Sequence, residues 1–169
     1  MAQTSVVISL LGPDIMQKGL GPKLFSNMYG STVLPLMREH GVRRIFAMTT
    51  LSIKLPEDHW TLIQTLVTNI MWLLLSSKYQ AMHNIKDVFV NDAQDIDWTL
   101  FRLTGIPGGA DEESWRRDRD QGKVFVGYIG LKGWTTSIKR AALARWLVDA
   151  AEDGQARWIR KMPAISARA

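Results

Sequence analysis

The sequence predicts an α/β fold in which a mostly parallel sheet lies between flanking helices, and two observations carry this prediction. The first is the order β-α-β-α-α-β-β-α-β, in which short apolar, β-branched segments alternate with longer segments of helical apolar spacing. The second is the continuous apolar run from Ile45 to Met48, which is typical of a strand covered by helices on both faces. Right-handed crossovers then place parallel strands side by side.

The first two elements are predicted to be a strand and a bent helix. Segment 5–11 is rich in β-branched residues and stops at Gly12 and Pro13, which favour a turn. Segment 24–40 has apolar residues at helical spacing, and Pro35 should start or kink that helix.

The next strand is predicted to carry the site. Gly41 closes the preceding helix, because glycine readily takes the left-handed conformation, and the strand occupies 43–49. Thr49, Thr50 and Ser52 stand at its carboxyl end, where open α/β sheets bind their ligands. The alternative is that these hydroxyls only cap the strand end.

Two helices are predicted to follow. Pro56 and the acidic residues after it favour a helix start, and the pattern extends over 57–78 and then over 79–93. Segment 60–75 has little polar face, which indicates a core helix or a subunit interface. It is too short and too often interrupted by polar residues to span a membrane.

The rest of the chain is predicted as strand, loop, surface excursion, strand, amphipathic helix and short strand. In that order the segments are 97–103, 105–109, 110–123, 124–129, 137–153 and 158–165.

Composition excludes several classes of protein. The 169 residues suit one globular domain, and the absence of cysteine excludes disulfides and thiolate chemistry. Three scattered histidines do not suggest a zinc site, and the three acids from Asp111 to Glu113 are read as a solvated loop rather than a cation site. The net charge of +5 is dispersed among acids, so we expect no nucleic-acid partner. No signal peptide is evident, and a cytoplasmic location is expected.

Four stretches in the order of the chain carry a family resemblance. They are a strand and loop at 6–12, a strand and hydroxyl-rich turn at 41–52, an acid-aromatic-Thr-apolar-apolar-Arg signature at 97–102, and a helix entry at 137–144. Together they resemble the fourth to sixth strands and a late helix of the atypical short-chain dehydrogenase/reductase superfamily, in particular its NmrA-like, NAD(P)H-binding branch. The resemblance covers residues 5–165.

The resemblance implies a truncated Rossmann-like, doubly wound sheet. Residues 1–169 would form a single domain that corresponds to the C-terminal part of the family fold, without the first half and its G-x-x-G-x-x-G phosphate loop. Gly19 and Gly21 are the nearest glycine pair, but Pro22 removes a donor. We therefore expect no cofactor to be bound by the isolated chain, with NADP as the alternative.

The resemblance also suggests where proton transfer takes place. Such reductases carry Tyr-x-x-x-Lys on the helix that corresponds to 79–93. Here Tyr79, His83 and Lys86 stand at i, i+4 and i+7 on one helix face, and a Tyr–His pair can transfer protons near neutral pH. The alternative is a half-buried Tyr and His beside a lysine that extends to solvent.

The predicted site combines these groups with nearby loops. The candidate catalytic residues are Tyr79, His83, Lys86, Thr49 and Thr50. The candidate substrate- or cofactor-binding residues are Leu11, Gly12, Pro13, Ser52, Met82, Pro107, Gly108 and Gly109, although the last three are also typical of a simple turn.

Three functions remain open from the sequence. The first is a small-molecule enzyme of isomerase or cyclase type that acts on an apolar substrate by acid–base chemistry without a tightly bound nicotinamide. The second is an NAD(P)H-dependent oxidoreductase whose first half is missing or is supplied by a partner. The third is a non-catalytic NmrA-like regulator.

A homodimer is also expected. An edge strand at 5–11 would offer unpaired backbone groups to another chain, and the apolar helix at 60–75 would offer a second surface.

Overall fold

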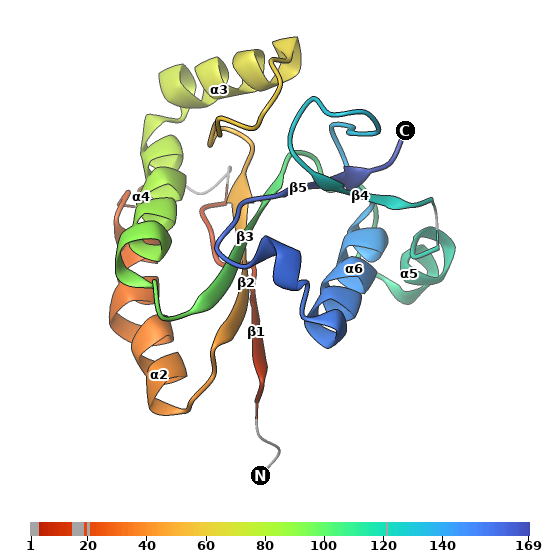
Figure 1. Ribbon diagram of the computed structural model, residues 1–169. Helices are drawn as coiled ribbons and strands as arrows, with labels where there is room; N and C mark the ends of the chain where they lie inside the picture. The colour runs from red at the N-terminus through yellow and green to blue at the C-terminus, as the bar shows by residue number, and fades with distance from the viewer. Residues whose placement is uncertain (1–3, 15–18, 20, 121) are drawn as a thin grey trace.

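The computed structural model of the protein describes residues 4–14, 19, 21–120 and 122–169 (Figure 1). Its five strands form one sheet in the order β1-β2-β3-β5-β4. The strands are β1 (Val6–Ser9), β2 (Arg44–Thr50), β3 (Asp97–Leu103), β4 (Val124–Gly127) and β5 (Ala164–Ala167). β1, β2, β3 and β5 run parallel, and β4 pairs with β5 in the antiparallel sense. The predicted α/β fold with a mostly parallel sheet is confirmed.

The helices cover both faces of this sheet (Figure 1). They are α1 (Leu24–Met28), α2 (Leu34–Glu39), α3 (Leu62–Leu74), α4 (Ser76–Asp92), α5 (Glu112–Asp118) and α6 (Arg140–Asp153). Helices α2 and α4 lie on one side of the sheet, and α5 and α6 lie on the other.

Successive side chains of the central strands pack into two separate hydrophobic cores, one on each face of the sheet. Ile45 and Ala47 of β2 pack with α2 and α4, whereas Phe46 between them packs with Phe101 and with Trp146 of α6. Because strand side chains alternate between the two faces, a strand covered on both faces must be apolar throughout. Burial on both faces therefore explains why the run from Ile45 to Met48 is continuously apolar.

The predicted helix over 24–40 forms, with a change of pitch before Pro35. A π-helical segment (Tyr29–Val33) joins α1 to α2, and Pro35 lies in the first turn of α2. Proline has no N–H and crowds the preceding turn, so a wider local turn lets the helix continue past it.

The predicted helix start at Pro56 is wrong. Residues 56 and 57 form a turn and 58–60 are irregular. Helix α3 begins at Leu62 with Thr61 as its N-cap, whose hydroxyl accepts a hydrogen bond from the Gln64 N–H at 3.1 Å. Asp58, one of the acids after Pro56, belongs instead to a buried ion pair with Arg102. Leu75, with φ −130° and ψ 39°, separates α3 from α4.

Helix α3 is not a core helix in this chain. Leu62, Leu66 and Leu73 are 69%, 55% and 67% exposed, while the polar Gln64 is buried. The core interpretation of segment 60–75 is therefore wrong, and the subunit-interface interpretation stays a prediction. Among the described residues no helix is both long and apolar enough to cross a membrane.

Later boundaries differ from the sequence prediction where loops pair with strands. The excursion at 110–123 contains α5, which Asp111 caps by accepting hydrogen bonds from the Ser114 N–H and hydroxyl at 2.8 and 2.9 Å. Ser137 bridges to Gly105, so α6 starts at Arg140 rather than at 137. The last strand lies at Ala164–Ala167 rather than at 158–165, because residues 156–158 form a 3₁₀ turn and Arg160 has a positive φ of 55°.

Candidate functional site

A cavity of about 210 Å³ lies where β2 and β3 end, between the sheet and helices α3 and α4. The lining is mostly apolar. It comprises Pro13, Met48, Thr49, Thr50, Leu51, Val67, Met71, Lys78, Met82, Leu103, Thr104 and Ile106. Four of these residues, Pro13, Thr49, Thr50 and Met82, were predicted site residues. The carboxyl edge of a parallel sheet is the usual binding position in open α/β folds.

The two threonines of β2 differ in their surroundings. Thr49 is 2% exposed, and its hydroxyl is 3.5 Å from the carbonyl oxygen of Phe101, which is a long contact. Thr50 is partly exposed, and its hydroxyl lies 3.5 Å from the N–H of Ser52, so it borders the turn that follows the strand. Thr50 is thus the more accessible of the two from the cavity.

The loop after β1 reaches α4 beside the cavity. A side chain at Gly12 would bring a Cβ atom within 2.8 Å of Met82 Cε, so the absence of a side chain there permits the close approach. The carbonyl oxygen of Leu11 faces the Tyr29 hydroxyl at 3.5 Å, and that hydroxyl is 2.7 Å from Ser9 Oγ. The predicted residues Leu11, Gly12 and Pro13 therefore share one end of the site with Met82.

The predicted stripe on α4 is formed, but it lies beside the cavity and does not line it. The rings of Tyr79 and His83 stack with centroids 4.2 Å apart, and Lys86 Nζ pairs with Asp87 at 3.1 Å. Cavity-lining residues on this helix are Lys78 and Met82, each one position earlier in the chain. Ser52 and His83 are neighbours across the gap between the turn and α4.

His83 and Ser52 both bury polar atoms that have no hydrogen-bond partner among the described residues, namely His83 Nε2 and Ser52 Oγ. Burial lowers the pKa of His83, the charge of Lys86 lowers it further, and Asp87 and the Ser52 backbone oppose these effects. The imidazole is therefore neutral at pH 7 and has an acceptor nitrogen that the surrounding residues do not use.

The predicted glycine loop at Pro107 to Gly109 does not join the cavity. The Pro107 carbonyl accepts a hydrogen bond from the Arg140 N–H at 2.9 Å, and Gly108 and Gly109 lie against Asp118, Asp111 and Ser114. This loop connects β3 to α5 and supports the start of α6, which corresponds to the turn alternative. Only Thr104 and Ile106, just before it, line the cavity.

A buried ion pair holds the turn that carries Ser52. Arg102 of β3 binds Asp58 through two hydrogen bonds of 2.6 and 2.7 Å, and the two side chains are 0% and 4% exposed. Arg102 also donates to the carbonyl oxygens of Ile53 at 2.9 Å and Met162 at 2.8 Å. In the sequence this arginine ends the strand signature at 97–102, and no functional role was predicted for it.

Asp58 gathers further donors around this pair. Its carboxylate accepts hydrogen bonds from the N–H groups of Leu55 at 2.9 Å and Ile129 at 3.0 Å, and from the amide of Gln64 at 3.3 Å. Burial alone would raise the pKa of Asp58, but the hydrogen bonds and charge of Arg102 outweigh it, and the pKa lies below its ordinary value. This network links β3, the turn after β2 and the start of α3.

The residues around the cavity fit the nicotinamide end of a dinucleotide. The cavity is apolar with hydroxyls at one side, Pro13 of the loop after β1 lines it, and Ser52 Oγ and His83 Nε2 lie beside it without a hydrogen-bond partner among the described residues. The described residues contain no glycine-rich turn from a strand directly into a helix, so they provide no pyrophosphate cradle of the usual kind. Nor do they contain a group of three or more His, Asp or Glu side chains that could hold a metal ion.

Comparison with known proteins agrees with this geometry. Residues 1–154 match an NAD(P)H-binding family. A search of the curated proteins found no match.

Solved structures of similar fold come from several bacteria. A short-chain dehydrogenase/reductase of wide type from Veillonella parvula, in complex with NADP, superposes with a TM-score of 0.62 at 13% identity over 96% of this chain and 62% of that chain. An oxidoreductase from Lactococcus lactis gives 0.62 at 12% identity, covering 97% and 62%. An anaerobilin reductase from Escherichia coli gives 0.52 at 14% identity, covering 96% and 63%. The chain thus spans about 62% of the first structure's length, and these likenesses establish the fold alone.

Proposed function

This chain belongs to the NAD(P)H-binding family, and from that premise we propose that it is a reductase of a small apolar molecule, with NADP as cofactor. The observation that carries the proposal is the cavity at the carboxyl ends of β2 and β3, which is largely apolar and contains one ionisable side chain, Lys78. Binding sites of this kind commonly combine an apolar wall with a few polar groups that orient the ligand. A quinone or an apolar carbonyl compound has matching chemistry.

Several residues of the chain would contribute to the proposed reduction. A bound nicotinamide would supply the hydride. Met48 and Met82 would keep water from the reacting atoms. The ammonium group of Lys78 would stabilise the negative charge that develops on the substrate oxygen.

The predicted stripe on α4 would serve proton transfer from behind the cavity wall. Reduction would leave an oxyanion on the substrate that must gain a proton. His83, which can take up a proton from solvent at Nε2, would pass it on as imidazolium, and the stacked Tyr79 lies against it. Its lowered pKa keeps His83 neutral at physiological pH, so activity that depends on proton donation by its imidazolium should rise as the pH drops toward and below the ordinary histidine value of about 6.5. Lys86 adds positive charge on the same face.

Family membership favours the NAD(P)H-dependent alternative over an enzyme that works without a nicotinamide. The comparisons give no support to an isomerase or cyclase that works without NAD(P)H.

We expect the purified chain to bind NADPH and reduced nicotinamide mononucleotide with affinities within tenfold of each other. The reason is that the described residues fit the nicotinamide end and contain no usual pyrophosphate cradle. Nicotinamide fluorescence and calorimetry measure both affinities. With menadione as a quinone probe, the NADPH-loaded chain should oxidise NADPH.

A variant with a closed cavity mouth provides the control. Thr104 is exposed and borders the cavity, so Thr104→Trp should fold normally and weaken both ligands together. If the folded wild-type chain binds neither ligand, the proposed function is wrong.

We also propose a homodimer in which α3 contributes to the interface. α3 carries no charged residue, and its outer side exposes Leu62, Leu66, Ile70 and Leu73. An apolar face of this kind is uncommon on a monomer, and β1 lies at an edge of the sheet, where its backbone can pair with another chain.

Light scattering at micromolar concentration should give the mass of a dimer. Leu66→Glu with Leu73→Glu should yield a monomer, because two charges would have to be buried at the interface. Val148→Glu is the matched control, since Val148 is 52% exposed on α6 and distant from α3. A wild-type monomer contradicts the proposal.

A further inference from the structure

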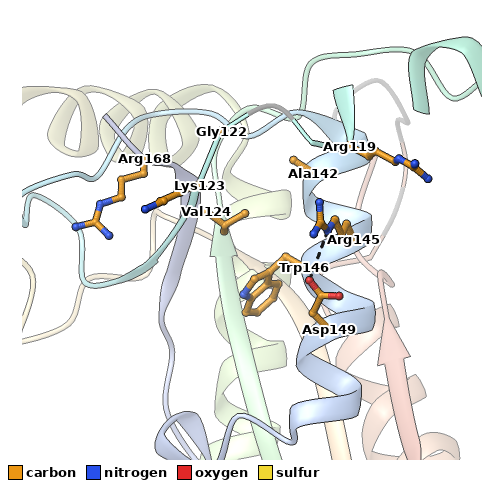
Figure 2. Close-up of a pocket in the computed structure, with 9 residues that line it drawn as sticks. All are labelled: Arg119, Gly122, Lys123, Val124, Ala142, Arg145, Trp146, Asp149 and Arg168. Carbon is orange, nitrogen blue, oxygen red and sulfur yellow. Dashed lines mark ion pairs between the residues drawn. The ribbon is translucent and has the colours of Figure 1, made fainter. Parts of the chain in front are cut away.

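A second cavity lies on the α5–α6 side of the sheet, away from the cavity described above, and Figure 2 shows the residues that line it. It is a groove of about 390 Å³ bounded by β4, α6 and the end of the chain, and Trp146 forms part of its apolar floor. Four cationic side chains from four different segments border it. They are Arg119, Lys123, Arg145 and Arg168.

The cations on the helical side are held in place by carboxylates. Arg145 pairs with Asp120 and, at 3.7 Å, with Asp149, while Arg119 pairs with Asp120 at 3.2 Å. These contacts orient the guanidinium groups and neutralise them in part. Figure 2 shows Arg145 and Asp149 on α6, with Trp146 between them and the opposite wall.

The cations on the opposite wall have no such partners. Val124 pairs with Ala167 in the antiparallel ladder, which places Lys123 and Arg168 opposite each other, and the Arg168 N–H donates to the Lys123 carbonyl at 2.8 Å. Neither side chain forms an ion pair within the described part of the chain. Like charges directly opposite on neighbouring strands are destabilising, so this arrangement costs stability unless an anion neutralises it.

We infer that this groove binds a small phosphate-bearing anion. Its volume falls in the range of small-molecule sites, and guanidinium groups recognise phosphate through paired N–H donors. Lys123 and Arg168 supply uncompensated charge on one side of the groove, where their cationic ends point away from Trp146, and Arg145 lies on α6 on the other side of Trp146. Trp146 offers an apolar contact for the rest of the ligand. This site is separate from the reductase cavity and does not depend on the proposed function.

Inorganic pyrophosphate is a suitable probe, measured by calorimetry at low and moderate salt. The wild-type chain should bind one equivalent, and the double variant Lys123→Met, Arg168→Met should bind it at least tenfold more weakly. Lys161→Met is a matched control, because it removes an exposed cation from the loop before β5, and it should leave the affinity unchanged. Equal weakening by Lys161→Met and by Lys123→Met would mean attraction to net charge alone and would overturn the inference, as would no binding by the wild type.

Thermal unfolding provides a second test of the same site, in which melting temperatures are compared and no binding constant is measured. Without pyrophosphate, Lys123→Met should melt at a higher temperature than the wild type, because it removes one of two opposed charges. With pyrophosphate, the wild type should gain stability, whereas the double variant Lys123→Met, Arg168→Met should gain none. A Lys123→Met variant that melts below the wild type and still gains stability from pyrophosphate would contradict the assignment. Nicotinamide binding should be the same in both proteins, so failure here is distinct from failure of the reductase proposal.

Discussion

Replacing Arg102 by Met should lower the free energy of unfolding by about 3–5 kcal/mol, because the Asp58 carboxylate would then be buried without its counter-charge. The loss should exceed that of an ordinary core substitution, since Arg102 also holds the carbonyl oxygens of Ile53 and Met162. Urea denaturation measures it, and the dependence on urea should keep its slope if the unfolded states are alike.

A surface pair provides the matched control. Arg116 and Glu112 also form an arginine–carboxylate ion pair, but their side chains are 73% and 76% exposed. Arg116→Met should therefore lower the free energy of unfolding by at most about 0.5 kcal/mol. If Arg102→Met does not fold, Arg102→Met combined with Asp58→Leu should partly restore stability by removing the lone charge. A loss below about 1 kcal/mol for Arg102→Met would contradict the buried ion pair.

Acid unfolding tests the same carboxylate. Since the folded-state pKa of Asp58 lies below its ordinary value, this group contributes stability above about pH 3.9 that is lost as the pH falls through the folded pKa. Asp58→Asn should therefore flatten the acid limb of the stability curve, at the cost of lower stability at neutral pH.

The sheet could be predicted from sequence because its signals are local. The continuous apolar run of β2 from Ile45 to Met48 follows from burial on both faces, and the predicted strand at 97–103 matches the observed bounds of β3. Burial of α3 could not be predicted in the same way. Apolar spacing indicates that a helix has an apolar face, but whether anything covers that face depends on the rest of the fold or on a second molecule.

The candidate site could be predicted only in part, because the spacing of residues on α4 does not show which face of the helix lines the cavity. Tyr79, His83 and Lys86 do share a helix face, as their spacing required, but spacing does not tell which face is turned toward the cavity. The cavity takes Lys78 and Met82, about 100° around the helix. The Arg102–Asp58 pair was missed because its two members lie 44 residues apart and meet only when β3 and the turn after β2 come together.

Lys78→Met should lower the rate of menadione-dependent NADPH oxidation by about 100-fold, which is the usual effect of removing one charge-stabilising group from an active site. Hydride addition to a quinone places negative charge on its oxygen, and an ammonium group in a largely apolar cavity stabilises that charge more than water would. Stopped-flow measurement of a single turnover isolates the chemical step from product release.

The comparison of two lysines distinguishes a catalytic effect from a general one. Lys54 is exposed in the loop after the Ser52 turn, so Lys54→Met removes the same charge without changing the cavity wall and should keep the wild-type rate. NADPH affinity should change by less than tenfold in Lys78→Met, and Lys78→Arg should retain part of the rate because the positive charge remains. A Lys78→Met variant that keeps half or more of the wild-type rate would remove Lys78 from the mechanism, and proton transfer by the Tyr79–His83 pair would then have to account for catalysis.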